Sequence, residues 1–268
     1  IDKFQKEVVE EEFWEYICSG TVEELYWVGG EPLMYDIHWR AMDRLAQDDN
    51  LKKVHLRYNS NLSRVRLGKH YLYEWLPQAK DWTMCASIDG TGWIGEFIRT
   101  GLKWDEWDKN FREGVRLPGG NDKMLMDLTL TGPGMFDLKN FFDYAQELDV
   151  KIETKRMFAF HSDIVFSPMA WPRHILDRII HENLDYIRPR ATHKQETLIR
   201  ELENMLTVPT FEEQWPEEHE DSFFKGRKWQ RRIAEMRPDQ AVTIEDVYKL
   251  DNELYDWWMR VDSLDNQR

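Results

Sequence analysis

Residues 24–32 read ELYWVGGEP, a short apolar run of high β-propensity that stops at two adjacent glycines. Strand-like segments at 54–58 and 82–88 also end in polar or glycine-rich tracts. Helical patterns at 36–47 and 69–78 separate these three strands. Strands separated by helices of this length predict a parallel sheet, either open or closed into a barrel.

The alternation of strands and helices continues to about residue 167, and helical patterns fill the remainder of the chain. Further helices are expected at 4–18, 104–115, 135–148, 171–186, 193–206, 219–236 and 244–261, and further strands at 124–130 and 152–160. Thr243 fits the N-cap of the last helix, and Asp246 three residues on makes an acidic variant of the capping box. The sequence therefore predicts a sheet domain at 1–167 followed by a helical C-terminal extension at 168–268.

Composition restricts the classes of protein to which the chain can belong. Of its 268 residues, 41% are hydrophobic and 32% are charged, which is typical of a globular, soluble protein. No run approaches the roughly 18 apolar residues that a membrane span needs, so no membrane partner is expected. The net charge of -14 repels a phosphate backbone, so nucleic acid is not an expected partner either.

Cysteine and histidine content argues against a metal site held by this chain. The two cysteines, Cys18 and Cys85, are too few for a zinc site or a disulfide framework and indicate a reducing, cytoplasmic setting. His161 and Asp163 have a spacing that could ligate a metal, but no third ligand lies nearby in the sequence. The sequence predicts no metal ligands.

Polar residues follow the first three predicted strands, at the points where a parallel α/β fold binds ligands. The first group is Gly29-Gly30-Glu31-Pro32, where two glycines let a ligand approach the backbone and Glu31 offers a carboxylate to a ligand ammonium. The second is Asn59-Ser60-Asn61. The third is Ser87-Ile88-Asp89-Gly90, where Ser87 and Asp89 face the same way and could bind sugar hydroxyls. Each group alone is typical of ordinary turns, but three in succession favour a ligand site.

A rival motif begins at Gly90, the last residue of the third group. Residues 90–95 read GTGWIG and match the dinucleotide-binding pattern G-x-G-x-x-G after a strand. That pattern should open a helix leading to a strand that ends in an acidic residue about 20 positions on, whereas the next strand here begins only near Met124. The context therefore argues against a nicotinamide-binding loop.

Taken together, these segments resemble the radical S-adenosylmethionine (SAM) superfamily, and specifically its twitch-domain-containing members. Residues 25–33, LYWVGGEPL, look like the family's second barrel strand with its GGEP motif. Residues 56–62, LRYNSNL, are similar to its third strand, and residues 86–90, ASIDG, continuing through 95–101, GEFIRTG, resemble the fourth strand and the loop after it. The resemblance is strongest over residues 20–130 and implies a partial TIM-type (β/α) barrel whose first strand is missing.

The resemblance assigns roles to these positions. It implies that Gly29, Gly30, Glu31 and Pro32 bind the methionyl amino group of SAM, and that Asn59 and Asn61 mark the polar end of the third strand. Ser87 and Asp89 would lie near the ribose and the methionyl part. Arg99 is a candidate for the SAM carboxylate, which suits a guanidinium fork, and Thr129 on the next strand is a weaker candidate for lining the pocket.

The chain departs from the family at its iron–sulfur cluster. Members hold a 4Fe–4S cluster with three cysteines spaced CxxxCxxC, upstream of GGEP. Only Cys18 lies upstream here, and it has no partners in the sequence. The simplest expectation is that a missing N-terminal segment carries these ligands. A natural loss of the cluster is the alternative.

The predicted function is that of a radical SAM enzyme core. It would bind SAM and, with the cluster of the missing segment, generate a 5′-deoxyadenosyl radical that modifies a substrate, for which the resemblance suggests a peptide or protein. An electron donor such as a flavodoxin or ferredoxin would be a partner, and this chain alone is expected to be inactive. Two alternatives remain: a noncatalytic SAM- or nucleotide-binding module, and an NAD-dependent oxidoreductase that uses the Gly90–Gly95 loop.

Overall fold

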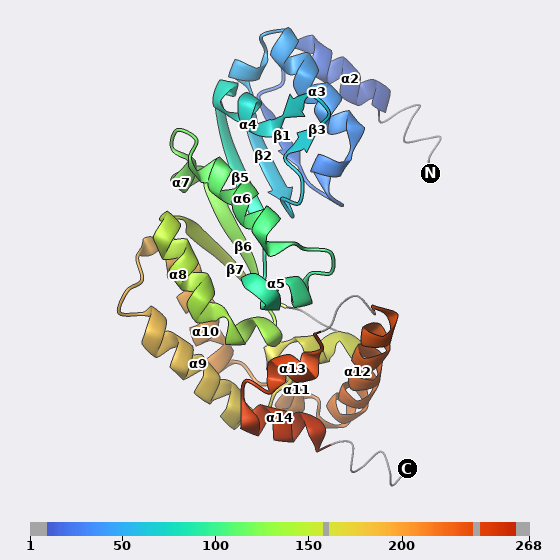
Figure 1. Cartoon of the computed structure of the whole chain (residues 1–268), viewed down its shortest axis with the longest axis vertical. Helices are drawn as coiled ribbons and strands as arrows, with labels where there is room; N and C mark the ends of the chain where they lie inside the picture. The colour runs from blue at the N-terminus through green and yellow to red at the C-terminus, as the bar shows by residue number, and fades with distance from the viewer. Residues whose placement is uncertain (1–9, 158–160, 238–241, 261–268) are drawn as a thin grey trace. The chain divides into compact units, whose positions relative to one another are not determined.

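The computed structural model describes residues 10–157, 161–237 and 242–260 (Figure 1). Five strands form one parallel sheet in the order β1-β2-β5-β6-β7. They are β1 (Glu24–Trp27), β2 (His55–Ser60), β5 (Asp81–Ser87), β6 (Met124–Leu130) and β7 (Lys151–Arg156). This confirms the predicted α/β class, and the arrangement is compatible with a partial TIM-type barrel. Among the described residues, no helix is both long and apolar enough to cross a membrane.

Two compact units make up the fold: Ile1–Ser87 with Asp105–Met126, and Ile88–Trp104 with Asp127–Arg268. The first contains β1, β2 and β5. In the register of these strands, Leu25 of β1 pairs with Leu56 of β2, and Leu56 pairs with Trp82 of β5. The predicted boundary between residues 167 and 168 stays a prediction.

Helix α3 (Asp36–Gln47) is amphipathic, and its apolar face packs against the sheet of the first unit, where Tyr58 of β2 contacts His38 and Met42. Its buried side chains include Trp39, Met42 and Leu45, at the spacing of one helical face. The bounds match the predicted helix at 36–47. The other elements of this unit are α2 (Glu10–Ser19), η2 (Pro32–Met34), η3 (Leu51–Lys53), β3 (Arg66–Leu67), β4 (His70–Tyr71), α4 (Leu72–Trp75), η4 (Leu76–Gln78) and α7 (Gly120–Lys123), while α6 (Trp104–Val115) begins at the unit boundary. Residues 4–9 of the predicted first helix lie outside the described part.

The prediction of one helix over 69–78 is only partly right. Arg66–Leu67 and His70–Tyr71 pair as a short antiparallel hairpin, and the helix begins at Leu72. Gly68 has φ +57°, the left-handed conformation that a tight hairpin turn requires and that glycine adopts without steric cost. Pro77 then lies in the 3-10 turn η4. The tight turn explains why the helix starts three residues late.

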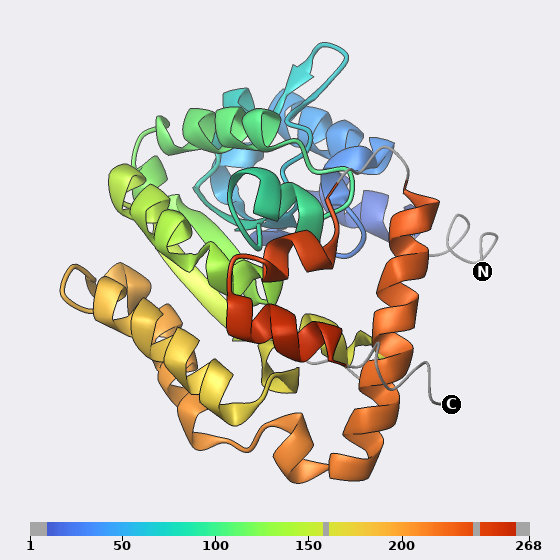
Figure 2. The same ribbon diagram turned by 60° about the horizontal axis from the view of Figure 1, so that its bottom comes forward.

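The second unit is mainly helical (Figure 2). Its elements are α5 (Gly92–Ile98), η5 (Pro133–Phe136), α8 (Leu138–Leu148), η6 (His161–Phe166), η7 (Pro168–Ala170), α9 (Arg173–Ile187), η8 (His193–Gln195), α10 (Glu196–Thr207), α11 (Phe211–Gln214), α12 (Pro216–Met236), α13 (Ile244–Tyr248) and α14 (Asn252–Met259). Helices α9 and α10 lie side by side. Strand β7 ends at Arg156, and residues 158–160 of the strand predicted at 152–160 lie outside the described part.

The predicted helix at 244–261, of which residue 261 lies outside the described part, is two helices. Thr243 caps α13 with the predicted box, because its side chain accepts from the Asp246 backbone while the Asp246 carboxylate accepts from Thr243. Asp251 then adopts an extended conformation, and its side chain accepts from the Leu254 backbone nitrogen. This second N-cap starts a new helix at Asn252 and ends the continuity that the apolar pattern suggested.

Candidate functional site

The turn after β1 needs glycine at two consecutive positions. Gly29 has φ +84° and Gly30 has φ +52°. These are left-handed backbone conformations, which residues other than glycine adopt only with strain. A Cβ on Gly30 would also lie 3.0 Å from the Tyr35 hydroxyl oxygen. Pro32 is buried and begins η2, where its missing N–H costs nothing. Three of the predicted site residues therefore shape the backbone that presents Glu31.

Glu31 joins the end of β1 to the end of β2. Its Oε1 accepts a hydrogen bond from the Ser60 hydroxyl at 2.7 Å and from the Leu33 backbone nitrogen at 3.1 Å. Its Oε2 accepts from the Asn61 backbone nitrogen at 2.6 Å. A carboxylate has about four acceptor sites, so these three bonds leave capacity for about one further donor. The carboxylate caps η2 and binds two neighbouring loops together.

The second predicted group contributes differently from the expectation. Ser60, which the sequence argument passed over in favour of the asparagines, is the side chain that contacts Glu31, and it is only 2% exposed. Asn61 offers its backbone nitrogen to Glu31, while its side-chain oxygen accepts from the Ser63 nitrogen in a local turn. Asn59 is half-buried, and its side chain makes no hydrogen bond to the described residues. Strand alternation was the available signal, since Ser60 shares the buried face of Tyr58.

In the second unit, Asp89, Arg99 and Thr129 come together. The Asp89 carboxylate is almost fully buried and accepts from Arg99 Nε at 2.7 Å and from the Thr129 backbone nitrogen at 2.8 Å. Arg99 follows the last residue of α5, and its side chain is 29% exposed. Nε is the only guanidinium nitrogen of Arg99 with a hydrogen bond to the described residues, so its two terminal nitrogens keep their donors.

Ser87 is the last residue of β5 and belongs to the first unit, while Asp89 belongs to the second. The predicted place of Ser87 near the ribose of SAM stays a prediction. Thr129 reaches Asp89 through its backbone nitrogen, and its half-buried side chain lies on the same strand face as Asp127.

The Gly90–Gly95 loop is explained by backbone packing. A Cβ on Gly95 would lie 2.2 Å from the Gly90 carbonyl oxygen, and one on Gly90 would lie 3.2 Å from the Gly95 nitrogen. The two glycines let α5 approach the chain that leaves β5. Helix α5 has only seven residues, and α6 and α7 intervene before β6. This departs from the strand–helix–strand unit of dinucleotide-binding folds.

A buried carboxylate supports this loop. Asp137 is 3% exposed; its Oδ2 accepts from the Thr91 backbone nitrogen, and its Oδ1 accepts from Asn140 Nδ2 at 2.9 Å. Burial raises the pKa of Asp137 above the ordinary value of 3.8, and the hydrogen bonds from Thr91 and Asn140 oppose that rise. Sequence analysis missed this residue because a carboxylate next to a helix start is usually an exposed cap.

The raised pKa of Asp137 predicts a pH dependence of stability. Between pH 3.8 and its folded pKa, the native state binds more protons than the unfolded state, so the free energy of unfolding falls as pH rises and levels off above that pKa. Asp137→Asn should remove this dependence, because its amide oxygen still accepts from Thr91 and it does not ionise. Urea unfolding of both proteins from pH 4 to pH 8 measures the difference. A difference between them that is independent of pH would contradict the assignment.

Metal ligands do not cluster in the described part of the chain. No group of three or more histidine, cysteine, aspartate or glutamate side chains there is arranged to hold a metal ion. Cys18 is exposed on α2, and Cys85 is half-buried on β5.

No family model matches this chain, and no curated protein matches it either. Solved structures similar to it include two of one protein. One is SuiB of Streptococcus suis, at 15% identity and a TM-score of 0.44 over 70% of this chain and 45% of that chain. The other is SuiB of the same organism bound to the precursor peptide SuiA, at 16% identity and a TM-score of 0.43 over 76% of this chain and 47% of that chain. The chain thus spans a little under half the length of each structure.

Proposed function

We propose that this chain is the SAM-binding core of a radical SAM enzyme. The observation that carries the proposal is the Glu31 carboxylate, which holds the GGEP turn against the end of β2 through Ser60 and Asn61. Two of the three segments that resemble family motifs are thereby fixed side by side at the carboxyl ends of neighbouring parallel strands. In parallel α/β folds this edge of the sheet is where ligands bind.

Each unit by itself offers a group that suits the methionyl part of SAM. In the first unit Glu31 keeps about one acceptor site, which suits an ammonium. In the second unit the terminal nitrogens of Arg99 keep donors, which suit a carboxylate. Gly29 has no heavy atom within 4 Å of the position its Cβ would take, so a ligand can approach its backbone. Within the full protein, bound SAM would supply the 5′-deoxyadenosyl radical, and these residues would orient it.

The residues of this chain do not fit a 4Fe–4S cluster. Such a cluster needs three cysteine ligands, and the chain has two cysteines, which lie on different elements. The proposal therefore places the ligands on another segment of the full-length protein and assigns the cluster no contact here. A peptide substrate and a flavodoxin or ferredoxin as electron donor belong to that larger protein and to the same proposal.

Calorimetric titration of the chain with SAM tests the binding step. We expect SAM to bind with one-to-one stoichiometry and Arg99→Ala to weaken it about tenfold, since a hydrogen bond between charged groups contributes about 1.5 kcal/mol. Arg200→Ala, which removes an exposed arginine of α10 without a hydrogen bond to the described residues, is the matched control and should bind SAM normally. Thermal melts establish that each variant is folded.

The same titration separates the alternatives. Binding of NAD without binding of SAM would overturn the proposal in favour of an oxidoreductase. Sequencing of the full-length gene is the second arm: CxxxCxxC upstream of Ile1 supports the enzyme, whereas SAM binding by a protein whose complete gene lacks those cysteines leaves a noncatalytic SAM-binding module.

A further inference from the structure

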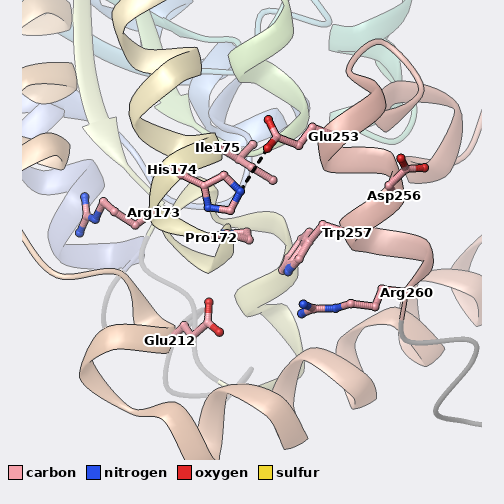
Figure 3. A pocket seen from close by; sticks show the side chains of 9 residues that line it. All are labelled: Pro172, Arg173, His174, Ile175, Glu212, Glu253, Asp256, Trp257 and Arg260. Carbon is pink, nitrogen blue, oxygen red and sulfur yellow. Dashed lines mark ion pairs between the residues drawn. The ribbon is translucent and has the colours of Figure 1, made fainter.

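A cavity of about 560 Å³ lies in the second unit, between the start of α9, α11 and α14 (Figure 3). Its volume falls within the range of 300–1,000 Å³ that is usual for ligand sites. Pro172, Ile175 and the Trp257 ring contribute apolar surface, and charged side chains surround them. None of the residues considered above as SAM ligands lines this cavity.

Two lining carboxylates have no cationic partner among the described residues. Glu212 on α11 and Asp256 on α14 are exposed and stand on opposite sides of Trp257 and Pro172 in Figure 3. A third, Glu253, pairs with His174 at 3.2 Å. The nearby positive charge of Arg173 is already balanced, because its guanidinium binds Glu213 at 2.7 Å and Asp177 at 3.3 Å. The cavity therefore presents acceptors for cationic groups on two sides.

Trp257 provides an independent indication of a ligand. The residue is 8% exposed, packs against Phe223 with ring centroids 4.5 Å apart, and turns the nitrogen edge of its indole into the cavity (Figure 3). Its Nε1–H makes no hydrogen bond to the described residues. An indole nitrogen can only donate, and this one is not among the buried atoms without a partner, so it is open to an acceptor on a ligand in the cavity or to water. Arg260 lines the same side of the cavity.

We propose that this cavity binds a peptide segment that carries arginine or lysine side chains. A peptide has carbonyl oxygens, which can accept from Trp257 Nε1–H, and its cationic side chains are complementary to Glu212 and Asp256. A simple cation would pair with the carboxylates but would use neither the indole donor nor the apolar surface of the cavity. This inference does not depend on SAM binding, and it can be tested on the chain alone.

Fluorescence anisotropy with a labelled, amidated peptide Gly-Arg-Ala-Arg-Gly tests the proposal. Citrulline in place of both arginines keeps the shape and removes the charge, and it should weaken binding by about tenfold, because both ion pairs are lost. Glu212→Gln and Asp256→Asn should each weaken binding about threefold and together about tenfold, as expected for exposed ion pairs. Trp257→Phe, which keeps a ring and removes the donor, should weaken it about fivefold.

Matched controls separate the cavity from the general attraction of an acidic protein for a basic peptide. Asp185→Asn on α9 and Glu217→Gln in the first turn of α12 each remove one exposed negative charge outside the cavity and should leave affinity unchanged. Thermal melts verify folding, in particular for Trp257→Phe. Equal weakening by these controls, equal binding of the citrulline peptide, or equally tight binding of free arginine amide would each overturn the proposal of a peptide site.

Discussion

Replacing Glu31 with alanine is expected to lower the free energy of unfolding by about 3 kcal/mol. The substitution removes the acceptor of three hydrogen bonds and leaves the Ser60 hydroxyl and the Asn61 nitrogen without their partner in a buried or half-buried setting. An unsatisfied donor there costs more than the net contribution of the bond that was lost. Urea unfolding at pH 7 measures the change.

Two further variants isolate the cause of that loss. Glu31→Gln keeps one oxygen acceptor and should lose about half as much stability. Glu23→Ala removes an exposed carboxylate just before β1 and should change the free energy of unfolding by less than about 0.5 kcal/mol. If Glu31→Ala were as stable as the unmodified chain and only SAM binding were lost, the link between the two loops would contribute no stability, and Glu31 would act on the ligand alone.

Replacing Asp89 with alanine is expected to destabilise the second unit by a similar amount, about 3 kcal/mol. The Asp89 carboxylate is 6% exposed and is the shared acceptor of Arg99 Nε and the Thr129 backbone nitrogen. Its loss leaves a backbone N–H in β6 unpaired and the Arg99 guanidinium without its anion. The measurement is again urea unfolding, followed by a signal from the tryptophans.

A double-mutant cycle apportions the Asp89 effect. Asp89→Ala, Arg99→Ala and the double variant should show a coupling of about 1.5 kcal/mol between the two side chains, because one of them is buried. The exposed pair Arg188 and Glu203, 2.5 Å apart, is the reference and should show a coupling below about 0.5 kcal/mol. Additive effects of Asp89 and Arg99 would contradict the ion pair and leave Thr129 as the partner that holds Asp89.

Local patterns predicted the elements best where a single periodicity ran without interruption. The helix over 36–47 was predicted with its observed bounds because its apolar residues follow one face. The pattern over 244–261 was just as regular, yet Asp251 restarts the helix by capping Leu254. An Asx side chain competes with the helical backbone for hydrogen bonds, and periodicity carries no information about which of them wins.

The sequence by itself determined that parallel strands end in three polar groups, and that glycines at 29 and 30 fit the first of these turns. The tertiary structure decided which side chains meet there. The Ser60 side chain, rather than the side chain of either asparagine, contacts Glu31 across 29 residues of chain, and the Thr129 backbone reaches Asp89 across 40. Period and propensity are local properties of a segment, whereas these contacts depend on the register between strands and on the path of the loops that join them.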